Sequence, residues 1–243
     1  MSAAPLLSVR ALDAHYGAAQ ILFGVDVDLS RGEVVALMGR NGAGKSTTIK
    51  AIMGLIDRRR GRIEFLGRDI SRLNPYEIAR LGLGFVPEDR RIFSDLTVLE
   101  NLEVGRRPPR VGPDDKLLEP WTPERLFALF PNLAEARARA AGRMSGGEQQ
   151  MLTVARTLMG NPLAILLDEP SEGVAPIIVE QMADMIIALK ASQVAILLSE
   201  QNLPFASLVA ERVYVIERGE IRFNGTMAAL QENEEARRAY LAV

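Results

Sequence analysis

The sequence contains no cysteine, which excludes a disulfide framework and any zinc site built from thiolates. Its one histidine, His15, excludes a metal centre that needs a cluster of histidines. No apolar run approaches the ~20 residues of a membrane-spanning helix, and residues 1–5 lack the charged and apolar regions of a signal peptide. We therefore expect a cytoplasmic protein that has a role at a membrane only through a partner.

The chain also has little net charge. Its 243 residues carry a formal charge of −2, so the overall charge does not predict a nucleic-acid partner. The composition, 48% hydrophobic and 25% charged, is that of an ordinary globular protein. This length is enough for one large domain or two small ones.

One short glycine-rich stretch organises the rest of the sequence. An apolar run precedes it at 34–38 and is typical of a buried strand, and residues 48–53 after it are typical of a helix. This order of strand, loop and helix argues against the alternative, an accidental glycine turn. The stretch matches the phosphate-binding pattern G-x-x-x-x-G-K-[ST] and consists of Gly39, Arg40, Asn41, Gly42, Ala43, Gly44, Lys45, Ser46 and Thr47.

The residue types in this phosphate loop suit a nucleotide with a metal ion. Its three glycines let the backbone approach an anion closely, and the loop amides and the helix N-terminus then point at the phosphates. Lys45 adds a positive charge for the β- and γ-phosphates. The Ser46 hydroxyl suits Mg²⁺, a cation that prefers oxygen ligands.

The remainder of the chain divides into an α/β core and a mainly helical insertion. We expect residues 1–87 and 161–243 to form the core and residues 88–160 to form a helical subdomain. Within the insertion, residues 132–142 are rich in alanine, arginine and glutamate, which predicts a helix. In the core, the basic run 57–62 is interpreted as a solvated loop.

Two acidic residues follow an unbroken apolar run of the core. Residues 163–167 are unbroken in their apolar character, as in a central parallel strand, and Asp168 and Glu169 come next. Open α/β sheets bind ligands at the carboxyl ends of their strands, so these carboxylates should meet the phosphate loop in one crevice. We expect Asp168 to hold Mg²⁺ together with Ser46, and Glu169 to orient or deprotonate the attacking water.

Together with these motifs, residues 144–150 resemble the signature of the nucleotide-binding subunits of ABC (ATP-binding cassette) transporters. The resemblance covers nearly the whole chain. It implies an α/β fold of the ABC ATPase type: a P-loop NTPase core with a mostly parallel sheet, an antiparallel β part and an inserted helical subdomain. It also implies ATP and Mg²⁺ as cofactors. In the family, each signature faces the ATP bound by a second subunit, so Ser145, Gly146 and Gly147 are candidate ATP-binding residues across a head-to-tail dimer.

Three positions depart from the general family pattern. Glu88 occupies the place of the usual Q-loop glutamine, and we count it as a further candidate ligand of Mg²⁺. Ala175 replaces the usual D-loop aspartate, and Gln201 replaces the switch histidine. A glutamine at that place can still donate a hydrogen bond to the γ-phosphate. Lys45, Glu169 and Gln201 are therefore the candidate catalytic residues, and we expect slow but real hydrolysis.

The resemblance narrows to one branch of the family at residues 86–93, 173–176 and 200–202. These segments are similar to the shorter ATPase of branched-chain amino acid uptake systems and of their relatives for urea and amides. Such systems combine two ATPases with two membrane permeases and an extracytoplasmic solute-binding protein. The implied partners are thus a second ATPase subunit, identical or different, and two permeases, at the cytoplasmic face of the cell membrane. Tyr16, an aromatic residue on an expected turn upstream of the phosphate loop, is expected to stack on adenine rather than to be a packed surface tyrosine.

ABC ATPases that act on DNA or on the ribosome are the alternative from a different class. The DNA-maintenance ATPases carry a coiled coil of hundreds of residues between the phosphate loop and the signature. Only 100 residues separate Lys45 and Ser145 here, without sustained heptads. Ribosome-associated relatives usually carry two cassettes, whereas this chain has one. We therefore expect no nucleic-acid partner.

Overall fold

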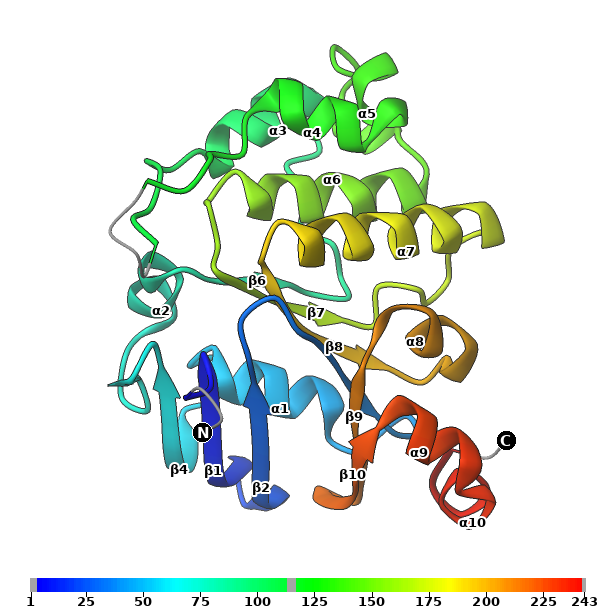
Figure 1. Cartoon of the computed structure of the whole chain (residues 1–243). Helices are drawn as coiled ribbons and strands as arrows, with labels where there is room; N and C mark the ends of the chain where they lie inside the picture. Colours follow the sequence, from blue (N-terminus) through cyan, green and yellow to red (C-terminus); the bar gives the residue numbers. More distant parts are fainter. Residues whose placement is uncertain (1–3, 113–116, 242–243) are drawn as a thin grey trace.

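Two β-sheets form the principal layers of the molecule (Figure 1). The computed structural model describes residues 4–112 and 117–241. In the larger sheet the strand order is β10-β9-β3-β8-β7-β6, and every neighbouring pair is parallel except β9 with β10. This confirms the mostly parallel core. Its strands are β3 (Val34–Met38), β6 (Leu83–Val86), β7 (Ala164–Asp168), β8 (Ala195–Glu200), β9 (Arg212–Glu217) and β10 (Glu220–Thr226).

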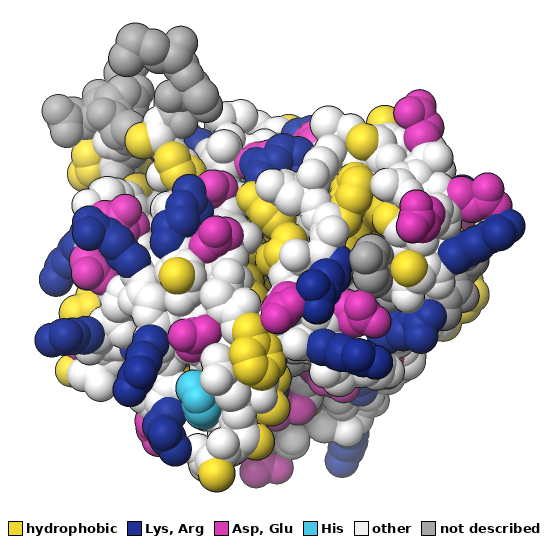
Figure 2. Space-filling view, turned by 90° about the horizontal axis from the view of Figure 1, so that it is seen from below, with side chains coloured by type: hydrophobic (Ala, Val, Ile, Leu, Met, Phe, Trp, Pro, Cys, Tyr) yellow, Lys and Arg dark blue, Asp and Glu magenta, His cyan; other side chains and the backbone are white. Residues whose placement is uncertain are grey.

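The smaller sheet is the expected antiparallel part, with the strand order β2-β1-β4-β5. The interpretation of residues 57–62 as a loop is wrong, because residues 58–62 belong to β4 and pair with β1. Most of their side chains face solvent, which gives the run the composition of a loop. Figure 2 shows basic and acidic side chains interspersed on this side of the molecule. The strands are β1 (Leu7–Tyr16), β2 (Ala19–Leu29), β4 (Arg58–Phe65) and β5 (Arg68–Asp69).

The residues of β3 alternate between two hydrophobic cores. Val35 and Leu37 face the core shared with helix α1 (Lys45–Ile52), which packs between the two sheets (Figure 1). Val34 and Met38 face the opposite core, which contains α6 (Gly146–Leu158) and α7 (Pro176–Ala191). Apolar residues on both faces of a strand are expected where helices cover both sides of a parallel sheet. The first residues of α1 therefore lie beside the carboxyl end of β3, at the edge where ligands bind such sheets.

Between residues 88 and 160, the described regular elements are helical. The predicted helix over 132–142 is largely wrong: α5 ends at Glu135, and only one short 3₁₀ turn follows. The backbone of this segment pairs instead with the start of α3, through bonds such as Ala141 N–H to the Leu96 carbonyl at 2.9 Å. Tertiary pairing thus overrides the helical propensity. The elements are α3 (Val98–Gly105), α4 (Pro123–Leu129), α5 (Pro131–Glu135), the 3₁₀ turn (Ala141–Arg143) and α6.

The remaining helices are α2, which precedes β6, and those that follow β8 toward the C-terminus. Within the described ranges, none of the helices has both the length and the hydrophobicity to cross a bilayer. They are α2 (Pro75–Leu81), α8 (Leu203–Val209), α9 (Met227–Glu232), α10 (Glu234–Ala236) and a final π-helical turn (Arg237–Leu241).

Candidate functional site

The phosphate loop connects the end of β3 to the start of α1, as the sequence predicts. Gly42 and Gly44 have φ angles of 79° and 114°, which glycine adopts readily and other residues rarely do. Gly39 cannot be replaced without a clash, because a Cβ atom there would lie 2.3 Å from the Ile216 carbonyl oxygen. The turn after β9 supports the loop as well, since Gly219 N–H donates to the Ala43 carbonyl at 2.8 Å. Residues 40–42 are exposed, so the loop opens toward solvent.

Lys45 is buried inside this loop. Its ammonium donates to the carbonyls of Gly39 at 2.8 Å and Arg40 at 3.2 Å. It also forms an ion pair with Glu169 Oε1 at 3.0 Å, and the two side chains are only 2% and 8% exposed. The two charges that the sequence assigns to catalysis therefore meet, although 124 residues separate them in the chain. Thr47, the last residue of the motif, is buried in the first turn of α1.

Ser46 and Asp168 come together at the neighbouring strand end. The Ser46 hydroxyl donates to Asp168 Oδ1 at 2.8 Å, and the Ser199 hydroxyl donates to the same oxygen at 2.7 Å. Asp168 is fully buried, yet its Oδ2 atom has no hydrogen-bond partner among the described residues. An unpaired buried carboxylate oxygen beside a hydroxyl suits Mg²⁺, which takes one or two carboxylates and completes its shell with water and phosphate. The residues present thus fit the expected metal.

Glu169 stands on a constrained turn. Its φ angle is 46°, in the left-handed region, and its N–H donates to the Ser199 carbonyl at 3.1 Å. Burial opposes ionisation, but hydrogen bonds with Glu172 and Lys45 and the charge of Lys45 outweigh it and lower the pKa of Glu169. The same hydrogen bond to Glu169, followed by partial burial and the charges of Glu169 and Glu88, raises the pKa of Glu172 to about 7. The pair therefore shares one proton near neutral pH.

The sequence alone did not single out Glu172, Ser199 or Glu200, which also surround this site. Ser199 and Glu200 end β8, which lies beside β7 with Ser199 opposite Asp168. Glu200 Oε2 accepts the backbone N–H of Gln201 at 3.2 Å, and Gln201 itself is exposed beyond the strand. The rule that ligands bind at carboxyl strand ends could have identified Ser199 and Glu200, because they follow the apolar run 194–198.

The signature residues lie elsewhere. Ser145 caps α6: its hydroxyl oxygen accepts the Glu148 N–H at 3.3 Å, and Glu148 Oε2 accepts the Ser145 N–H at 2.7 Å. Gly146 and Gly147 form the first turn of this helix, which packs in the core on the side of the sheet opposite α1. A Cβ atom at Gly147 would lie 2.7 Å from the Ile178 side chain. The fold thus presents two separate glycine-rich helix N-termini, as two anion sites require.

Tyr16 and Glu88 are both exposed. Tyr16 is the last residue of β1 rather than part of a turn, and it is 49% exposed. Glu88 follows β6 in an exposed loop. Among the described residues, no three His, Cys, Asp or Glu side chains gather into a metal-binding group. A metal at Asp168 therefore needs ligands from water or nucleotide, and the role of Glu88 stays a prediction.

Comparison with known proteins agrees with this geometry. A model of the family described as ABC transporter matches residues 22–172. The chain is 42% identical to the high-affinity branched-chain amino acid transport ATP-binding protein BraG of Pseudomonas aeruginosa, over 97% of this chain and 99% of that protein. It is 32% identical to the lipopolysaccharide export system ATP-binding protein LptB of Haemophilus influenzae, over 97% of both chains.

A solved structure supports the same assignment. The fold matches the ADP conformation of MJ1267, an ATP-binding cassette of an ABC transporter, with a TM-score of 0.77 and 29% identity over 94% of each chain. The family match covers more than half of the chain and includes the phosphate loop, Ser145–Gly147 and Glu169. The chain therefore belongs to the ABC transporter family, as one of its ATP-binding and ATP-hydrolysing subunits.

Proposed function

We propose that this chain powers an importer of branched-chain amino acids from the cytoplasmic face of the membrane. One observation carries the proposal: the 42% identity to BraG extends over 97% of this chain and 99% of that protein. A related role in export has weaker support, because the identity to LptB is 32%. Import of urea or amides remains the alternative within the same branch.

The proposed chemistry combines the buried contacts of Lys45, Asp168 and Glu169 with the exposed residues Tyr16, Glu88 and Gln201. Lys45 and the loop amides bind the β- and γ-phosphates, and Tyr16 stacks on the adenine. Ser46, Asp168 and Glu88 would hold Mg²⁺, which would supply positive charge to the phosphate oxygens. Glu169 takes a proton from the attacking water as the water oxygen bonds to the γ-phosphorus and the bond to the leaving ADP breaks. Gln201 donates a hydrogen bond to the γ-phosphate.

The proposed working unit is a pair of ATPase subunits. Ser145, Gly146 and Gly147 of one subunit face the γ-phosphate held by the phosphate loop of the second, and the reverse holds for the other ATP. Each ATP therefore joins the two subunits, and its hydrolysis removes the contacts that hold them closed. Residues 88–160 act in this proposal as a helical subdomain that carries Ser145 and moves with closure.

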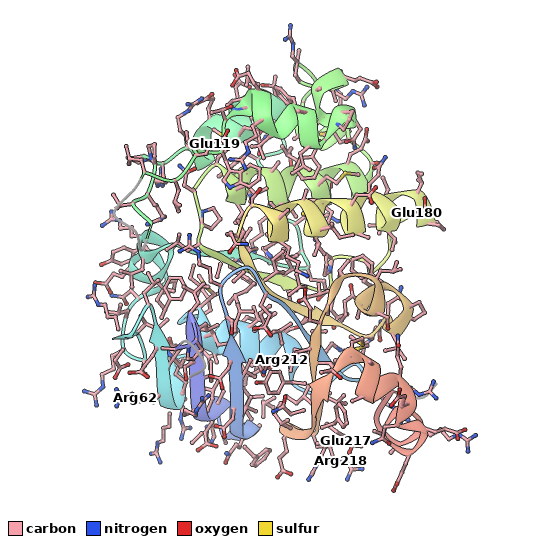
Figure 3. The ribbon with its side chains drawn as sticks, viewed as in Figure 1. Arg62, Glu119, Glu180, Arg212, Glu217 and Arg218 are labelled. Atoms are coloured by element: carbon pink, nitrogen blue, oxygen red, sulfur yellow. The ribbon has the colours of Figure 1, made fainter. Side chains whose placement is uncertain are left out.

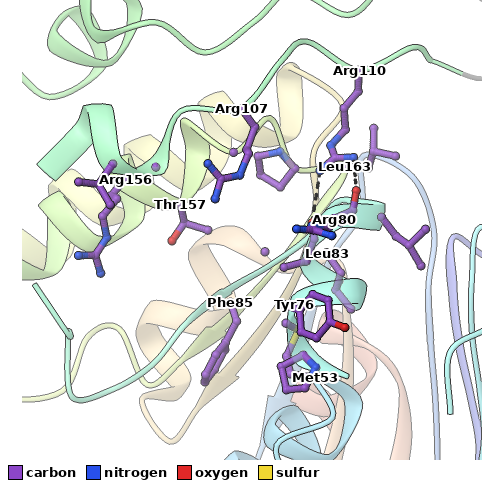
Figure 4. Close-up of a pocket in the computed structure, with 18 of the residues that line it drawn as sticks. Met53, Tyr76, Arg80, Leu83, Phe85, Arg107, Arg110, Arg156, Thr157 and Leu163 are labelled. Atoms are coloured by element: carbon purple, nitrogen blue, oxygen red, sulfur yellow. Dashed lines mark hydrogen bonds between the residues drawn. The ribbon is translucent and has the colours of Figure 1, made fainter. Parts of the chain in front are cut away.

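A groove beside this subdomain is the proposed seat of a permease. It has a volume of about 1040 Å³ and lies between α2, β6 and the segment around 104–111 (Figure 4). Six large apolar side chains with high exposure line it: Leu55, Leu66, Tyr76, Phe93, Val104 and Val111. Among the described residues, no aspartate or glutamate lines the groove, but five arginines do: Arg80, Arg91, Arg107, Arg110 and Arg156. Such a lining suits an apolar helix of a partner that carries a carboxylate.

The experiment is a pull-down of the tagged chain from gently solubilised native membranes, with its partners identified by mass spectrometry. We expect two permeases and a second ATPase. Uptake of labelled leucine should then fall when the chain is deleted and return when it is restored, whereas urea uptake should not change. Recovery of ribosomes or DNA without any membrane protein would contradict the transport role.

A further inference from the structure

One buried carboxylate near the site has no part in the chemistry described so far. Glu200 is the last residue of β8 and is only 1% exposed. Among the described residues, no lysine or arginine lies within ion-pair distance of it. A buried carboxylate without a counter-ion is unfavourable unless hydrogen-bond donors solvate it. The identity of its donors therefore indicates what the residue does.

The donors come from two different loops. Glu200 Oε1 accepts the backbone N–H of Ser171 at 3.1 Å, in the turn that follows Glu169. Glu200 Oε2 accepts the backbone N–H groups of Gln201 and Asn202, each at 3.2 Å, in the loop after β8. Burial raises the pKa of Glu200, while these hydrogen bonds favour the ionised, acceptor-only form. A single side chain thus joins the turn after β7 to the loop after β8.

The adjacent residue strengthens this link. The Ser199 hydroxyl donates to Asp168 Oδ1 at 2.7 Å and accepts the Glu169 N–H at 3.2 Å. Because β7 and β8 are parallel neighbours with Asp168 opposite Ser199, both loops leave the same edge of the sheet. Glu169 and Gln201 therefore stand on two loops whose relative position Glu200 holds by backbone contacts.

We propose that Glu200 is a positioning residue for ATP hydrolysis, which fixes the loop of Gln201 against the turn of Glu169. The inference rests on the proposed roles of Glu169 and Gln201. Glu200 does not touch ATP in this proposal. It keeps the Glu169 carboxylate and the Gln201 amide, which are carried on separate loops, at fixed positions relative to the γ-phosphate. Displacements of about 1 Å in such groups lower rates by about a hundredfold, so the geometry of this link matters.

The first test is steady-state ATP hydrolysis by the purified transporter complex. Glu200→Ala should lower kcat about tenfold or more, with KM for ATP within about twofold of wild type, because the phosphate loop keeps its own contacts. Glu200→Gln retains one acceptor oxygen and should restore part of kcat, and it also serves as the test if the alanine variant does not fold. Glu211→Gln is the matched control: Glu211 Oε2 accepts the Val34 N–H at 2.9 Å, at the opposite end of the sheet.

A double-mutant cycle with Gln201→Ala separates positioning from a general structural role. If Glu200 acts through Gln201, the combined loss of kcat should be clearly smaller than the product of the two single losses. Losses that multiply would overturn the inference, as would an unchanged kcat in Glu200→Ala or in Gln201→Ala. If the wild-type complex imports solute and hydrolyses ATP normally, but the two single losses of kcat multiply in the double variant, only this inference is overturned. A wild-type complex without hydrolysis overturns the proposed function.

Discussion

The ammonium of Lys45 lies 3.0 Å from Oε1 of Glu169, and both side chains are buried. Lys45 is the residue expected to bind the γ-phosphate, yet here the carboxylate expected to activate water is its counter-ion. An arriving phosphate must therefore compete with Glu169 for the same cation. We therefore expect nucleotide binding and the activation of Glu169 to be linked, with Lys45 releasing the carboxylate when it binds the phosphate.

This competition leads to a prediction for Glu169→Gln. The amide removes the base, so hydrolysis should fall at least about a hundredfold. It also removes the negative charge that competes for Lys45, so ATP should bind a few times more tightly. Calorimetry of ATP binding and a phosphate-release assay check the two effects. Glu180→Gln is the control, since Glu180 projects outward from α7 (Figure 3); hydrolysis of Glu169→Gln at the wild-type rate would contradict the assignment.

Asp168→Asn should specifically weaken the binding of Mg²⁺ at the site. The unpaired Oδ2 oxygen of Asp168 is the atom that we expect to contact the ion or its water, and an amide supplies a poorer ligand. We expect the Mg²⁺ concentration for half-maximal hydrolysis to rise at least about tenfold, while ATP binding without Mg²⁺ changes little. A magnesium titration of hydrolysis measures this, with Asp184→Asn on the exposed face of α7 as control. Equal magnesium curves for both variants would exclude Asp168 as a ligand.

The Glu172 carboxyl predicts a pH dependence of stability. Its hydrogen bond to Glu169 raises its pKa from 4.5 to about 7, so the native protein binds more protons than the unfolded chain between these values. The contribution is fully present below pH 4.5, and it is lost as the pH rises toward and through 7. Glu169 shifts in the opposite direction, and its contribution is lost below its ordinary pKa of 4.5.

Glu172→Gln, which stays neutral at every pH, should therefore gain stability relative to wild type as the pH rises from 5 to 8. Thermal unfolding of both proteins across this range measures the difference, and Glu180→Gln gives the background for loss of an exposed charge. Because Glu172 is largely exposed, we expect a small effect with a definite sign. Parallel stability profiles for wild type and Glu172→Gln would show that the two carboxyls do not share a proton.

The meeting of Ser46 with Asp168 was predictable from the sequence. Both residues follow strong apolar runs, and the ends of parallel strands in one sheet converge on one edge. The contacts of Ser199 and Glu200 were less accessible, because they depend on which strand lies beside β7 and on the register of that pairing. The local sequence pattern indicates neither the strand that lies beside β7 nor the register of that pairing. Glu169, which forms the hydrogen bond with Glu172, has a left-handed φ of 46° that a glutamate rarely adopts.

The two segments whose structure differs from the prediction have a common physical cause. Residues 58–62 form a strand because β1 supplies their backbone partners, although their side chains are mostly basic and exposed. Residues 136–142 leave the helix because residues 94–99 accept and donate their backbone hydrogen bonds. In both cases a partner distant in the sequence decides the local structure, and local composition gives no signal of it. Helix starts differ in this respect, because Thr97 and Ser145 each form a capping box with a glutamate three residues later, and this signal is local in the sequence.

Gly219 offers a sharp test of the support for the phosphate loop. An added Cβ atom would lie 1.9 Å from the Ile21 carbonyl oxygen, on a residue whose φ is +80°. We expect Gly219→Ala to destabilise the protein by about 3 kcal/mol or more, and to weaken ATP binding because Gly219 N–H holds Ala43. Gly67→Ala is the matched control: its φ is +71° but no atom lies within 4 Å, so only a backbone cost of about 1 kcal/mol is expected. Similar unfolding midpoints for the two variants would contradict this account.

The groove allows assembly to be separated from catalysis. Arg80 lines it with an exposed guanidinium 5.4 Å from the Tyr76 ring centroid, and among the described residues no carboxylate pairs with it. Arg80→Glu should therefore repel an acidic partner helix and lower co-isolation of the permeases about tenfold, while ATP binding by the separate chain is unchanged. Arg62→Glu on the antiparallel sheet is the control, because Arg62 is exposed but outside the groove (Figure 3). Equal permease recovery with both variants would exclude charge-guided docking at Arg80. Loss of ATP binding in Arg80→Glu would show that the groove and the nucleotide site are not independent.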